Sequence, residues 1–113
     1  MPESTIPLEV DVLTIKQKLD RGEDFLLLDC REPEEFAIAK ITSAELIPMS
    51  QLRERMGELE AHRQRLIVVH CHHGGRSLRV AMWLRRQNFP SAQSMAGGID
   101  AWSQQIDASV PRY

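Results

Sequence analysis

Two short, continuously apolar runs constrain the fold of this chain most. Phe25-Leu26-Leu27-Leu28 and Leu66-Ile67-Val68-Val69 contain no polar residue, whereas a strand with one solvated face would alternate apolar and polar residues. Such runs are typical of strands buried on both faces of a parallel sheet. Because amphipathic stretches separate the runs, the sequence predicts βα units in a three-layer α/β fold, with a parallel sheet of four to five strands flanked by about five helices.

The predicted elements follow one another without a long linker or an internal repeat. The expected strands cover residues 8–10, 25–28, 45–47, 66–70 and 92–95. The expected helices cover residues 12–20, a short segment opened by Pro33, and residues 51–62, 77–87 and 99–104. Asp11 and Ser50 are expected to cap two of these helices, because their side-chain oxygens can accept hydrogen bonds from backbone amides. Asn88 is expected to end the fourth helix in a left-handed conformation.

Length, charge and cysteine content narrow the classes of protein that remain. The 113 residues predict one domain spanning residues 1–113. A net charge of −2 argues against nucleic-acid or anionic-membrane partners, which need a basic excess. No apolar run approaches the roughly 18–20 residues of a membrane span, and the opening Met1-Pro2-Glu3-Ser4 does not resemble a secretory signal. Two cysteines are too few for a disulfide framework, so a cytoplasmic location is expected.

The segment from residue 70 to residue 77, His-Cys-His-His-Gly-Gly-Arg-Ser, carries the clearest chemical signal. Cys71 stands where a predicted parallel strand ends, and ligands of open α/β sheets bind at that edge. The following helix N-terminus and a curled loop of amides would stabilise a thiolate and lower the pKa of Cys71. Gly74 and Gly75 permit the backbone angles of a tight curl, and Arg76 supplies a fixed charge suited to an oxyanion.

The same segment allows two other interpretations. In the first, Cys71 is an inert buried cysteine, as cysteines at strand ends often are. The adjacent Gly-Gly-Arg-Ser argues against this interpretation. A zinc site is suggested by the cluster of His70, Cys71, His72 and His73. Neighbouring residues at a strand-to-loop junction point in different directions and do not share one tetrahedral ion, so we expect no metal and no cofactor.

Three segments of the chain resemble the signatures of the rhodanese superfamily. Residues 71–77 resemble its active-site loop, Cys-x-x-Gly-x-Arg followed by Ser or Thr. Residues 27–36 resemble its Leu-Asp-x-Arg-x-x-x-Glu-Phe signature, and residues 96–102 resemble its Gly-Gly-x-x-x-Trp signature. The order and spacing also match. One departure is visible, because Ala39-Lys40-Ile41 stands where the family usually has Gly-His-Ile; it puts the local helix and turn geometry in question.

The resemblance implies a sulfurtransferase that works through a persulfide. The thiolate of Cys71 would take sulfur from a small donor such as thiosulfate and pass it to cyanide, to a thiol or to a sulfur-accepting protein. The loop would bind the substrate through the residues His72, His73, Gly74, Gly75, Arg76 and Ser77. Their backbone amides would hold the terminal sulfur anion and Arg76 would orient an anionic donor, while His72 and His73 are either attracting groups or bystanders.

The resemblance also leaves two alternative functions, because other proteins with the rhodanese fold are phosphatases or non-catalytic binding modules. Rhodanese-related protein phosphatases have one more residue between the loop cysteine and arginine than the four between Cys71 and Arg76. A non-catalytic binding module usually lacks the cysteine. Outside the loop, Asp29 and Arg31 are expected to pair with each other or with nearby backbone, and Cys30 is expected to be a packing residue. Trp83 and Trp102 are expected to be core and helix-docking residues.

Overall fold

Five parallel strands form one sheet in the computed structural model, which describes residues 6–113. The strands are β1 (Glu9–Val10), β2 (Phe25–Asp29), β3 (Glu45–Leu46), β4 (Leu66–His70) and β5 (Ala92–Met95). Their order across the sheet is β1-β5-β4-β2-β3, and every neighbouring pair is parallel. The predicted three-layer α/β fold is therefore confirmed. The expectation about residues 1–4 lies outside the described part of the chain.

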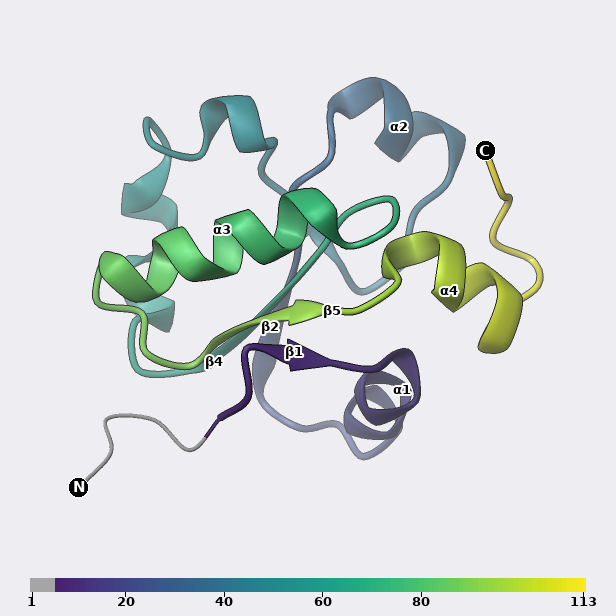
Figure 1. The fold of residues 1–113 in the computed structure, drawn as a ribbon, viewed down its shortest axis with the longest axis horizontal. Helices are drawn as coiled ribbons and strands as arrows, with labels where there is room; N and C mark the ends of the chain where they lie inside the picture. The colour runs from purple at the N-terminus through teal and green to yellow at the C-terminus, as the bar shows by residue number, and fades with distance from the viewer. Residues whose placement is uncertain (1–5) are drawn as a thin grey trace.

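Residues 6–113 form four α-helices, which are α1 (Val12–Asp20), α2 (Pro33–Ile38), α3 (Gly75–Arg86) and α4 (Gly98–Gln105). Of these, α1, α3 and α4 pack on the two faces of this sheet. Figure 1 shows α3 on one side of the sheet, together with the segment between β3 and β4, and α1 on the opposite side. Asp11 caps α1 as expected, since its carboxylate accepts a hydrogen bond from the Thr14 amide at 2.9 Å. None of the helices described from residue 6 onward is long and apolar enough to cross a membrane.

The core consists of two apolar layers separated by the sheet. Alternate residues of a strand face opposite sides, so Leu26 and Leu28 pack toward Val80 and Leu84 of α3. Leu27 faces the other way, into the layer formed with α1 and α4. The central strands need apolar residues on both faces for this reason, which explains the unbroken runs in the sequence.

The segment from residue 51 to residue 62 corrects one prediction. An α-helix was expected there, but the chain forms two 3₁₀ helices, η1 (Met49–Gln51) and η2 (Met56–His62), joined by turns. Gly57 weakens an α-helix by about 1 kcal/mol relative to alanine, and the Ser50 hydroxyl donates to the Glu32 carboxylate instead of capping. Burial of Leu52 and Leu59 against α3 fixes the segment, so tertiary packing overrides the helical pattern.

Candidate active site

Cys71 lies at the carboxyl end of β4, immediately before the loop that enters α3. Its side chain is buried, and its sulfur accepts hydrogen bonds from the amides of Gly74 at 3.1 Å and Ser77 at 3.3 Å. Burial alone raises the pKa of Cys71, but hydrogen bonds from the Ser77 side chain and from the amides of Ser77, Gly74 and Arg76 outweigh it. The net effect lowers the pKa of Cys71 below that of an ordinary thiol, which favours the nucleophilic thiolate.

The tight curl of the loop depends on Gly74. Its φ of +112° lies in a region that residues with a side chain rarely adopt. This residue is the N-cap of α3, which begins at Gly75, so the unpaired amides of the first helical turn lie beside the sulfur. The partial positive charge of a helix N-terminus adds to the stabilisation of an anion there.

The outer side of the loop is tied to α4 through the backbone. The amides of Ile99 and Asp100 donate to the carbonyls of Cys71 at 2.9 Å and His72 at 3.0 Å. Gly98 makes this approach possible, because a Cβ at this position would lie 2.5 Å from both carbonyl oxygens. The contact occupies the loop carbonyls and leaves the amides of Gly74 and Ser77 on the side of the sulfur.

Two buried serines, Ser77 and Ser94, lie next to each other, and Ser77 also lies next to the sulfur. The Ser77 hydroxyl lies 3.4 Å from the sulfur of Cys71 and 2.8 Å from the hydroxyl of Ser94, which comes from β5. With a thiolate present, Ser77 can donate to the sulfur while Ser94 donates to Ser77. Sequence reasoning missed Ser94, because only the pairing of β4 with β5 brings it to the site.

Arg76 forms a two-pronged ion pair with Glu35 of α2. The distances are 2.7 Å from Nη1 to Oε1 and 2.9 Å from Nη2 to Oε2. The hydrogen bonds from Arg76 lower the pKa of Glu35 to about 2, although burial opposes this shift. The guanidinium expected to face an anionic donor is thus held by a carboxylate at the loop, and Glu35 stands in the Glu-Phe pair of the N-terminal signature.

The expected pairing of Asp29 with Arg31 is confirmed at the end of β2. Both side chains are fully buried, and the shortest distance between them, from Nη2 to Oδ2, is 2.6 Å. Arg31 also donates to the Ala39 carbonyl at 2.6 Å and to the Tyr113 hydroxyl at 2.8 Å. The departure at residues 39–41 therefore leaves a backbone acceptor for Arg31, at the residue that ends α2.

The chain's last residue covers one side of the loop. The ring of Tyr113 stacks on His72 with centroids 3.9 Å apart and planes 5° apart, and its hydroxyl donates to Glu35 at 2.8 Å. Burial, followed by the charge of His73, lowers the pKa of His72, so this ring is neutral near pH 7. No sequence signal indicated this role for Tyr113.

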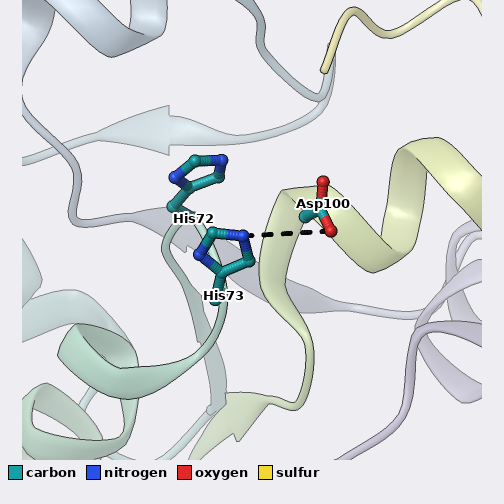
Figure 2. A group of neighbouring side chains, drawn as sticks. All are labelled: His72, His73 and Asp100. Atoms are coloured by element: carbon teal, nitrogen blue, oxygen red, sulfur yellow. Dashed lines mark ion pairs between the residues drawn. The ribbon is translucent and has the colours of Figure 1, made fainter. Parts of the chain in front are cut away.

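His72 and His73 approach Asp100 of α4 at the rim of the loop (Figure 2). One ligand atom from each residue lies within 4.8 Å of the others, and His73 Nε2 is 3.9 Å from the carboxylate. Arg112 already binds that carboxylate at 2.9 Å, and a cation there competes with a metal ion. His70 does not belong to this group, because its side chain is fully buried; burial also lowers its pKa to about 4.

Cys30 occupies the strand end next to Cys71 but has the opposite electrostatic setting. It is buried in the apolar layer under α3, and burial, followed by the charges of Cys71 and Asp29, raises its pKa. Its thiol therefore stays protonated at neutral pH. The packing role expected for Cys30 agrees with this environment.

The family model of the rhodanese-like domain matches residues 12–105 of the chain. The chain belongs to the rhodanese-like family. The matched region contains all three signatures, from Leu27 in β2 to Trp102 in α4. The matched region also contains the Cys71 loop.

Relatives of this rhodanese-like chain include short and long proteins. It is 34% identical over 96 residues to a sulfurtransferase of Allochromatium vinosum, covering 85% of this chain and 88% of that protein. It is 36% identical over 118 residues to the maize adenylyltransferase and sulfurtransferase MOCS3-2, covering all of this chain but 24% of that protein. The chain thus spans about a quarter of the maize protein.

The structural comparison agrees with this family. A rhodanese-related protein from Thermoplasma volcanium superimposes with a TM-score of 0.77 at 27% identity, covering 88% of this chain and 94% of that one.

Proposed function

We propose that this rhodanese-like protein is a sulfurtransferase that carries a sulfane sulfur on Cys71. The observation that supports it most is the sulfur of Cys71 within reach of the Gly74 and Ser77 amides and the Ser77 hydroxyl. These donors favour the thiolate before the reaction and can hold a terminal sulfur anion after it.

The reaction consists of two displacements. The Cys71 thiolate attacks the outer sulfur of thiosulfate, and the sulfur–sulfur bond of the donor breaks as sulfite leaves with the electron pair. Cys71 now bears a persulfide. Cyanide or an acceptor thiolate then attacks the terminal sulfur, forms thiocyanate or a new persulfide, and releases the Cys71 thiolate. No oxidant or reductant is needed.

Fixed positive charge beside the site comes from Arg76 and not from His72. His72 is neutral near pH 7 because its pKa is lowered, so it offers a hydrogen-bonding ring. Arg76 is the cation of the loop, and its pairing with Glu35 leaves the pair close to neutral overall. An anionic donor would then bind by drawing the guanidinium from Glu35, and the acceptor is a small nucleophile or a protein thiol.

Mass spectrometry after thiosulfate treatment tests this proposal. The expected result is the mass of one added sulfur on the Cys71 peptide, which cyanide or a reductant removes. Cys71→Ser should abolish the addition while Cys30→Ser keeps most of it. An unmodified Cys71 peptide combined with robust release of phosphate from an aryl phosphate would instead support the phosphatase alternative.

A further inference from the structure

A groove runs beside the candidate site, between α3 and the segment that contains η1. It encloses about 350 Å³. Its lining residues are Met49, Leu52, Arg53, Arg79, Val80, Met82, Trp83 and Arg86. A second hollow of about 410 Å³ shares Arg53 and Trp83 with it and extends it toward Gln87. The floor is apolar, and the charged residues that line it are all arginines.

Arg53, Arg79 and Arg86 differ from the other arginines of the chain. Each other arginine makes an ion pair or hydrogen bond, with Arg85, for example, donating to the Ala92 carbonyl. The three groove arginines make neither with any residue from 6 to 113, and the guanidinium of Arg53 lies 5.9 Å from the ring centroid of Trp83. All three are exposed. Unpaired cations concentrated in one groove favour an acidic ligand.

The apolar floor provides a second recognition element. Met82 is 42% exposed, and Trp83 is partly buried beside it. Methionine and tryptophan side chains adapt to an inserted apolar group and contribute large contact areas. A ligand that fits both features carries carboxylates around an apolar anchor.

The groove lies along α3, the helix that begins in the Cys71 loop. Residues three and four apart share one face of a helix, and Arg76, Arg79 and Trp83 follow this spacing along α3. An α-helix rises about 1.5 Å per residue, so Arg79 is only about one turn from Arg76. A chain segment lying in the groove would place its end at the mouth of the Cys71 loop.

We propose that this groove docks an acidic protein segment with one apolar anchor, belonging to the protein that exchanges sulfur with Cys71. This proposal rests on the proposed function. The chain as a whole has a net charge of −2 and would repel an extended polyanion. The recognised acidic segment is therefore short and confined to the groove. A short acidic segment meets only the basic groove, and its anchor fills the floor.

Binding of a synthetic probe tests the groove without any sulfur chemistry. The probe is a fluorescein-labelled peptide of Asp and Glu residues around one Leu, ending in Cys, and its control has Asn and Gln in place of the acids. The acidic peptide should bind the full chain more tightly than the amide peptide, and added salt should weaken it. Arg79→Glu with Arg86→Glu should weaken binding by at least about tenfold, since close charge pairs contribute more than 1.4 kcal/mol.

Matched variants separate the groove from general charge effects. Arg21→Glu reverses the charge of one exposed arginine that does not line the groove, as each groove substitution does, and it should leave binding nearly unchanged. Met82→Gln should weaken binding of both peptides, because it removes apolar surface and no charge. No binding of the acidic peptide, or equal binding by the native and double-variant proteins, would overturn the docking proposal.

Sulfur transfer then distinguishes the docking proposal from the proposed function. With a persulfide on Cys71, the double variant should show a raised KM for the peptide thiol and an unchanged rate with cyanide. A groove that binds the peptide in a protein that never forms a persulfide would sink the proposed function alone. Tighter binding of an oligonucleotide or of phosphatidylserine vesicles at the groove, or self-association lost in the double variant, would overturn the docking proposal.

Discussion

The guanidinium of Arg76 lies against the carboxylate of Glu35, forty-one residues away in the chain, with both nitrogen–oxygen distances below 3 Å. This pair joins the Cys71 loop to α2. Under the proposed function, a donor anion and Glu35 would compete for the same cation.

Substitutions at the two ends of this pair should act in opposite directions on thiosulfate. Arg76→Ala should raise KM for thiosulfate by about tenfold, as expected for the loss of a charge-assisted hydrogen bond of about 1.5–3 kcal/mol. Glu35→Gln should leave KM unchanged or lower it, since it frees the guanidinium. Steady-state kinetics with thiosulfate and with an uncharged organic trisulfide measure the difference. Equal losses with both donors in both variants would show that the pair only supports the fold.

The pH dependence of alkylation should report the lowered pKa of Cys71. A lowered pKa means more thiolate at a given pH, so the rate with iodoacetamide should reach its plateau at lower pH than for a free thiol. Ser77→Ala should move the midpoint upward, because it removes a hydrogen bond to the sulfur. Cys30→Ser is the control and should leave the profile unchanged, since burial raises the Cys30 pKa. A native midpoint at or above that of a free thiol would refute this assignment.

Gly98→Ala should disrupt the loop more than a typical glycine substitution. Its Cβ would meet two carbonyl oxygens at 2.5 Å, in addition to the cost of a left-handed φ of +61°, which is roughly 1–2 kcal/mol. Gly22→Ala is the matched control, because its φ is +66° and no atom lies within 4 Å of the added carbon. The midpoint temperature of thermal unfolding and the rate of thiosulfate turnover should both fall further for Gly98→Ala than for Gly22→Ala. Similar effects of the two variants would mean that the contact with α4 is unimportant.

Removing the ring of Tyr113 should change the titration of His72. Burial lowers the pKa of this imidazole because it disfavours the charged form. Tyr113→Ala exposes the ring, so its pKa should rise toward the ordinary value, whereas Tyr113→Phe keeps the stack and should keep the pKa low. Histidine titration by NMR measures both. A pKa that rises as much in the Phe variant would assign the shift to the lost hydroxyl.

The sequence predicted those parts of the fold that depend on burial or on backbone freedom. The run from Leu66 to Val69 needs two apolar layers, and the strand is found there. Asn88 has the expected positive φ. The prediction of an α-helix over residues 51–62 was wrong, because the spacing of its apolar residues fits 3₁₀ helices packed on α3 as well as it fits an α-helix.

Much of the candidate site was beyond sequence reasoning for a different reason. The loop residues from Cys71 to Ser77 are neighbours in the chain, and so their common location could be predicted. Ser94 and Tyr113 reach the loop from other elements, and only sheet pairing and the path of the C-terminal segment bring them there. Polar residues of this kind show no periodicity that would mark them.

The donors around the Cys71 sulfur are almost all main-chain groups, and α4 fixes the loop by binding its carbonyls. The side chains at positions 72 and 73 do not build this cradle. Exchanges at these two positions are therefore expected to leave the amide donors of the sulfur in place. Under the proposed function, such exchanges would change the surface that meets a sulfur donor or acceptor without changing the cradle that holds the reacting atom.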